Sequence, residues 1–75
     1  MRIRIARKVK SSNGNVRAFT IKINGSKYPK VHNGYYFTGN PYKAKSMALC
    51  DYLGIKINSF EYFNQLPLIE KILKK

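Results

Sequence analysis

Acidic side chains are scarce in this chain, which has three Asp and Glu against fifteen Lys and Arg, together with one cysteine and one histidine. Such a sequence shows no paired carboxylates, no nucleophile next to a base and no cluster of metal ligands. Its five glycines are isolated from one another, so no glycine-rich phosphate loop is present. We therefore expect a protein that is not an enzyme and that holds no metal and no cofactor.

Long apolar runs are also missing. No run of apolar residues approaches the roughly 18 that a membrane-spanning helix needs. The N-terminal residues lack the apolar core and the small-residue cleavage site of a signal peptide. We therefore expect no membrane partner and a cytoplasmic location, which is the host cytoplasm if a phage encodes the chain.

Positive charge dominates what is present, and it is unevenly distributed. The net charge is +12, and residues 1–50 carry eleven of the fifteen basic groups and no acid. So much charge on so small a body attracts polyanions, above all nucleic acids. The distribution predicts that a polyanion binds this N-terminal part of the chain.

The opening stretch RIRIARKVK, residues 2–10, alternates apolar and basic side chains with the period of a β-strand. The residues predicted to face the core are Ile3, Ile5 and Val9, and those on the opposite face are Arg2, Arg4, Lys8 and Lys10. Arg7 breaks this alternation, because it falls on the apolar side. It indicates either a side chain that reaches past the covering helix or a local bulge.

The turn sequence SSNGN ends this strand and predicts a hairpin. We expect a three-residue loop from Asn13 to Asn15, because an odd loop length keeps the apolar faces of the two strands together. The expected pairs are Val9 with Phe19, Ile5 with Ile23, Lys8 with Thr20 and Arg4 with Asn24.

A second hairpin is predicted at Asn24-Gly25, two residues that suit a type I′ turn. This turn sets Lys22 opposite Lys27 and begins a third strand. Because Pro29 has no N–H to donate, that strand should be short and lie at an edge of the sheet. Asn33-Gly34 is predicted to close a further tight turn.

Helix signals follow the strands. Asn40 and Pro41 suit an N-cap and the first helical position, and Gly54 suits the C-terminal stop. Ser59 is predicted to cap a last helix. The expected fold is a single α+β domain over 1–75, with an antiparallel three-stranded sheet in 1–38, a helix in 40–54 packed across one face, and a C-terminal helix in 59–74.

Like charges opposite each other on neighbouring strands are destabilising, yet no acid intervenes between the predicted rows of cations. A phosphate backbone would supply the missing negative charge, whereas the alternative is that the lysines only guard solvated strand edges. The candidate nucleic-acid-binding residues are Arg2, Arg4, Lys8, Lys10, Arg17, Lys22, Lys27 and Lys30.

The order of these elements resembles two families of DNA-binding domain, the ethylene-response-factor domain of plants and the arm-binding domain of phage-type integrases. The matching features are VRAFTIKING at 16–25, YFT at 36–38, Ala44 and Ala48 in the helix, Gly54 at its end and Asn58 beyond it. Val16 stands where the plant pattern has tryptophan. The resemblance implies that the sheet enters the major groove of duplex DNA, where its outward Arg and Lys contact bases and phosphates.

Two other interpretations fit the same sequence. The chain also suits a phage-type inhibitor that binds a host nucleic-acid enzyme, such as an anti-CRISPR protein or a polymerase inhibitor, with Phe60, Tyr62 and Phe63 in the protein contact. Structured RNA attracts the same positive charge as DNA. The C-terminal helix is, in addition, a candidate homodimer contact.

Overall fold

The computed structural model of the chain describes residues 1–31 and 34–74. Its elements are β1 (Ile3–Lys10), β2 (Val16–Ile23), β3 (Ser26–Tyr28), α1 (Pro41–Leu53) and α2 (Phe60–Leu73). The strands form one antiparallel sheet in the order β1-β2-β3. The α+β class and the three-stranded sheet are thus confirmed.

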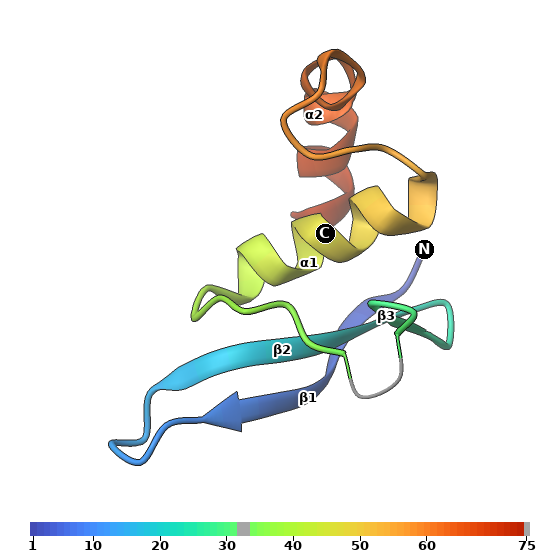
Figure 1. Ribbon diagram of the computed structural model, residues 1–75. Coiled ribbons are helices and arrows are strands. Elements are labelled where there is room, and N and C mark those ends of the chain that lie inside the picture. The colour runs from blue at the N-terminus through green and yellow to red at the C-terminus, as the bar shows by residue number, and fades with distance from the viewer. Residues whose placement is uncertain (32–33, 75) are drawn as a thin grey trace.

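Both helices lie on one side of the sheet, and they leave the other face without a covering helix (Figure 1). Helix α1 lies across the inner face of the sheet, and α2 packs against α1. We call the uncovered side the outer face. No helix in the described part of the chain is both long and apolar enough to cross a membrane.

The β1–β2 register differs from the expected one. Ile3 pairs with Ile23 and Ile5 with Ile21, after which the ladder shifts, so that Ala6 is an extra residue on β1. A second shift follows near the hairpin end, where Arg17 is the extra residue on β2. All four expected pairs were wrong: Val9 with Phe19, Ile5 with Ile23, Lys8 with Thr20 and Arg4 with Asn24. The Ser11 N–H donates to the Asn15 carbonyl, so the turn lies over 12–14 and begins one residue earlier than expected, which moves the whole register by two residues. The two bulges shift the pairs between them by one residue, which changes the residues that share a face there.

The second hairpin agrees with the prediction. Lys22 pairs with Lys27, and Asn24 and Gly25 both have positive φ, at 52° and 88°. β3 has three residues and lies at the edge of the sheet. The turn expected at Asn33-Gly34 falls partly outside the described residues, since Asn33 is not among them.

The helix ends follow their local signals. The Asn40 side chain accepts hydrogen bonds from the backbone N–H groups of Tyr42 and Lys43, and Gly54 ends α1 in the left-handed region at φ 74°. The Ser59 side chain accepts from the N–H of Tyr62 at the start of α2. Both predicted helices are confirmed to within about a residue at each end.

The core lies between the sheet and α1, and α2 adds one fully buried side chain, Ile69. Small side chains on α1 let the helix approach the sheet closely, and apolar residues of β2 supply most of the opposite wall. Its most buried members are Ile21, Ile23, Ala44, Ala48, Leu49, Cys50 and Ile69. This one-sided burial fixes which face of the sheet is the outer one.

Candidate nucleic-acid interface

Three cations form a line across the outer face of the sheet. Arg4 on β1 is opposite Lys22 on β2, and Lys22 is opposite Lys27 on β3. Directly paired residues share a face, and the neighbours of Lys22 in sequence, Ile21 and Ile23, are buried against the helices. Lys22 and its two partners therefore point the other way, and we call these three residues the cationic row.

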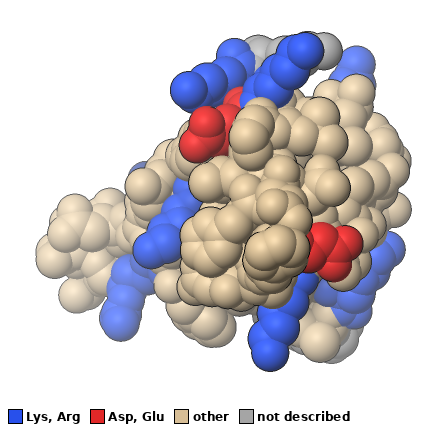
Figure 2. All heavy atoms as spheres, turned by 90° about the horizontal axis from the view of Figure 1, so that it is seen from above, with Lys and Arg blue, Asp and Glu red and all other residues tan. Residues whose placement is uncertain are grey.

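No acidic side chain is present in residues 1–31, which include the whole sheet. Asp51 is on α1, and Glu61 and Glu70 are on α2. In the view from above, onto the helices, most of the visible surface carries no charge, and many of the blue Lys and Arg side chains lie toward its rim (Figure 2). The carboxylates thus sit on the helices, and the cationic row stays unneutralised by the sheet itself.

The bulge at Ala6 adds a fourth cation to the outer face. It sets Arg7 opposite Thr20, whose sequence neighbours Phe19 and Ile21 are core residues. The Arg7 Nη1 donates a hydrogen bond of 3.5 Å to the Tyr35 hydroxyl. This bond raises the pKa of the Arg7 guanidinium, so the group stays fully charged.

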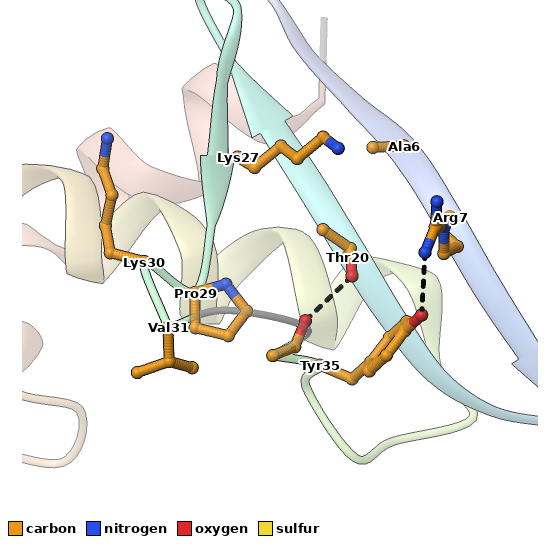
Figure 3. Close-up of a pocket in the computed structure, with 9 residues that line it drawn as sticks. Ala6, Arg7, Thr20, Lys27, Pro29, Lys30, Val31 and Tyr35 are labelled. Atoms are coloured by element: carbon orange, nitrogen blue, oxygen red, sulfur yellow. Dashed lines mark hydrogen bonds between the residues drawn. The ribbon is translucent and has the colours of Figure 1, made fainter.

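An open hollow of about 570 Å³ lies on the outer face beside the cationic row. The residues that line it are Ala6, Arg7, Thr20, Lys27, Pro29, Lys30, Val31, Gly34 and Tyr35. The buried Thr20 hydroxyl donates to the Gly34 carbonyl at 3.0 Å, and this bond holds the returning chain against β2 (Figure 3). The hollow therefore has a hydrogen-bonded floor and cationic side chains on two strands.

Two of the candidate binding residues lie away from the cationic row. Lys8 pairs with Phe19 and Lys10 with Val16, and both partners pack in or against the core on the α1 side. The prediction that Lys8 and Lys10 share the face of Arg4 was wrong. The physical reason is the extra residue at Ala6, which reverses the alternation for the rest of β1.

The remaining candidates also lie apart from the hollow or at its margin. The Lys30 ammonium lies 4.8 Å from the centre of the Tyr28 ring, a cation–π contact, and it points away from the hollow (Figure 3). Arg2 lines a second, smaller hollow with Lys45 and the end of α2. Arg17 is the extra residue of the second bulge.

Arg7 and Tyr35 were not among the predicted site residues. The one sequence signal for Arg7 is that it falls on the apolar side of the alternating strand pattern. A bulge is one of the two explanations for that position. Nothing local predicts Tyr35, because its position depends on the pairing of Tyr36 with Phe19, 17 residues earlier in the chain. Contacts between such distant positions are set by the whole fold.

The rest of the described chain offers little reactive chemistry. Within residues 1–31 and 34–74, no group of three or more His, Cys, Asp or Glu side chains is placed to hold a metal ion. The Cys50 thiol is fully buried, and burial raises its pKa, which disfavours the reactive thiolate. The outer face can bind anions through charge and hydrogen bonds.

No protein-family model matches this chain, and comparisons with the curated proteins and with the solved structures find no match either.

Proposed function

We propose that the protein binds nucleic acid through the outer face of its sheet, with duplex DNA as the ligand. The observation that carries this proposal is the cationic row, in which Lys22 has a cation directly opposite it on each side. Such a row costs stability in the free protein, and a sheet surface that served only solubility would mix charges of both signs. A phosphate backbone relieves the repulsion.

Charge supplies most of the affinity for the ligand, and the shape of the sheet supplies recognition of the groove. The major groove of B-DNA is about 12 Å wide and admits a two-stranded β-ribbon, a shape that β1 and β2 provide. In it, the planar Arg4 guanidinium suits a bidentate contact to guanine or phosphate, and the lysines act as point charges on phosphates. A nucleic-acid ligand also agrees with the cytoplasmic location expected from the sequence.

The test compares two double variants of equal charge change. Arg4→Glu with Lys22→Glu reverses two charges of the outer face, whereas Lys8→Glu with Lys10→Glu reverses two charges of β1 that lie on the other face. Fluorescence anisotropy with a labelled duplex should show binding lost in the first variant and largely kept in the second. Equal losses in both variants would mean that net charge alone drives binding, and the proposal would be wrong.

Salt dependence supplies a second readout from the same experiment. Each neutralised phosphate contributes a slope of about −0.9 to the plot of log affinity against log salt, so four cations predict a slope near −3.6. Parallel titrations with duplex RNA and single strands identify the preferred nucleic acid. If structured RNA binds more tightly than every duplex DNA tested, the ligand is RNA and not DNA.

A protein partner is the second candidate, and the surface of α2 favours it. Phe60 is 82% exposed and Phe63 57% exposed, which is unusual for two aromatic side chains one turn apart on a helix. A host nucleic-acid enzyme or a second copy of the chain would bury them. Sedimentation of the wild type and of the double variant Phe60→Ser, Phe63→Ser tests the homodimer. If the chain dimerises through these side chains, a larger species should appear only in the wild type.

A further inference from the structure

We infer that the hollow beside the cationic row binds one unpaired nucleotide of the nucleic-acid ligand. The hollow is lined by β1, β2 and β3 and by residues on either side of the undescribed pair 32–33. Its lining combines cations and apolar groups in one place. A nucleotide has the same combination, since an anionic phosphate is joined through its sugar to a flat base with apolar faces.

Two cations address the phosphate. Arg7 comes from β1 and Lys27 from β3, on either side of Thr20 in the strand between them. The Lys27 side chain extends across β2 toward Ala6, so its ammonium approaches the Arg7 side of the hollow (Figure 3). A guanidinium carries five N–H donors, and the single bond from Nη1 to Tyr35 leaves others for phosphate oxygens.

The Tyr35 hydroxyl has a positioning part in this site. It accepts the hydrogen bond from Arg7 and so fixes a long side chain that is otherwise exposed to solvent. Holding the guanidinium in place before the ligand arrives lowers the entropy lost on binding. Tyr35 lines the hollow as well, which brings its ring to the same ligand.

Size and apolar lining indicate more than a phosphate ion. The volume of about 570 Å³ falls within the range of roughly 300–1,000 Å³ typical of small-molecule sites. Ala6, Pro29 and Val31 give the hollow an apolar wall, and Val31 is largely exposed at its rim. A bare phosphate would leave this wall in contact with water, whereas a base or sugar would cover it.

The nucleotide has to be unpaired, because a base within a duplex is stacked and paired and cannot enter a hollow in a protein. A strand end, an overhang or a mismatch supplies such a nucleotide at low cost. This inference rests on the proposed function for the identity of the ligand, since the cationic row would hold the adjoining backbone.

The test is a titration of the whole protein, followed by NMR of the backbone amides, with thymidine 5′-monophosphate, thymidine and inorganic phosphate as separate probes. We expect the monophosphate to shift the amides of Ala6, Thr20 and Gly34 and to bind about tenfold tighter than either fragment. Arg7→Gln should weaken its binding about tenfold, the usual size of one lost charge-assisted hydrogen bond. Lys8→Gln, the neighbouring residue on the other face, is the control and should bind as the wild type does.

A second variant separates positioning from charge. Tyr35→Phe keeps the ring and all charges but removes the hydroxyl, and we expect a several-fold loss of affinity for the monophosphate. The inference is overturned if the monophosphate binds no tighter than inorganic phosphate, or if Arg7→Gln and Lys8→Gln behave alike. Its failure is separable from that of the proposed function, because duplex binding that depends on Arg4 and Lys22 would persist.

Discussion

Arg4 lies directly opposite Lys22 on the sheet face that no helix covers. Lys22 is also opposite Lys27, so its ammonium has a like charge as its nearest cross-strand neighbour on both sides. Side chains in such pairs have Cβ atoms about 5 Å apart, close enough for charges to interact even at a surface. The arrangement makes a specific prediction about stability.

Replacing Lys22 by Glu is expected to stabilise the fold while it weakens DNA binding. The carboxylate would attract Arg4 and Lys27 where the ammonium repels them. The two pairs together should raise the free energy of unfolding by about 1 kcal/mol. For a domain of this size, that corresponds to a rise in melting temperature of about 4–8 °C. Thermal melts at low and at high salt measure it, and the gain should shrink as salt screens the charges.

Lys22→Gln is the matched control, since it removes the repulsion without adding attraction, and its melting temperature should fall between the other two. A Lys22→Glu variant that melts below the wild type at low salt would show that the cationic row is not under electrostatic strain.

The hydrogen bond that Tyr36 donates to the Asp51 carboxylate links the segment beside β2 to α1. The pKa of Tyr36 is raised well above the usual value of about 10. Burial is the larger cause, and this hydrogen bond is the second. Since the folded phenol resists ionisation more than the unfolded one, its contribution to stability is complete below about pH 10 and is lost as pH rises further. Equilibrium unfolding should therefore show a stability that declines above pH 10.

Tyr36→Phe should lower the free energy of unfolding by about 1 kcal/mol at pH 7 and flatten the alkaline decline. Tyr42→Phe, which changes an exposed tyrosine of α1, is the control and should keep the decline. If both variants follow the wild-type pH profile, Tyr36 is not the source of it.

Gly34 lies tightly packed behind the hollow. An added Cβ at this position would be 2.3 Å from Val31 Cγ2 and 2.8 Å from Pro29 Cγ, distances that force these groups to move. We expect Gly34→Ala to lower the free energy of unfolding by about 1–3 kcal/mol, as overpacking usually does. Chemical denaturation gives the value.

The same substitution made together with Val31→Ala removes the closest of these clashes. The double variant should recover part of the stability lost in Gly34→Ala. If the stability lost in the double variant equals the sum of the losses in Gly34→Ala and Val31→Ala alone, the strain comes from elsewhere in the segment.

Cys50 supplies a probe of opening. Its thiol has no exposed surface, and burial raises its pKa. A thiol reagent such as dithionitrobenzoate should react with the native protein at least a hundredfold more slowly than with the protein in denaturant, because reaction requires the core to open. Rapid reaction of the native protein would contradict the packing of α1 on the sheet.

Elements with strong local signals could be predicted from the sequence. Asn24-Gly25 needs two positive φ angles, and Asn40 and Gly54 satisfy the backbone groups at the ends of α1, so turn and helix follow from a few residues. Lys22 was placed opposite Lys27 for this reason. The core of the site was thus within reach of sequence analysis.

The first hairpin could not be predicted in the same way. Its turn sequence admits several loop lengths, and the bulges at Ala6 and Arg17 leave little trace in an alternation that is only eight residues long. The alternation alone therefore predicts the wrong face for Lys8 and does not assign Arg7 to the site. The hollow was not predicted at all, because it depends on a segment that returns to β2 from farther along the chain.

β1 is also an edge strand, and it presents basic side chains along its whole length. An uncovered edge invites other chains to add to it, and positive charge is one of the means by which proteins prevent this. The charges proposed to attract a polyanion therefore also keep copies of the protein apart. High salt or a saturating ligand masks these charges and should therefore lower the colloidal stability of the protein. Copies that stay dispersed without ligand should then assemble once their charges are neutralised.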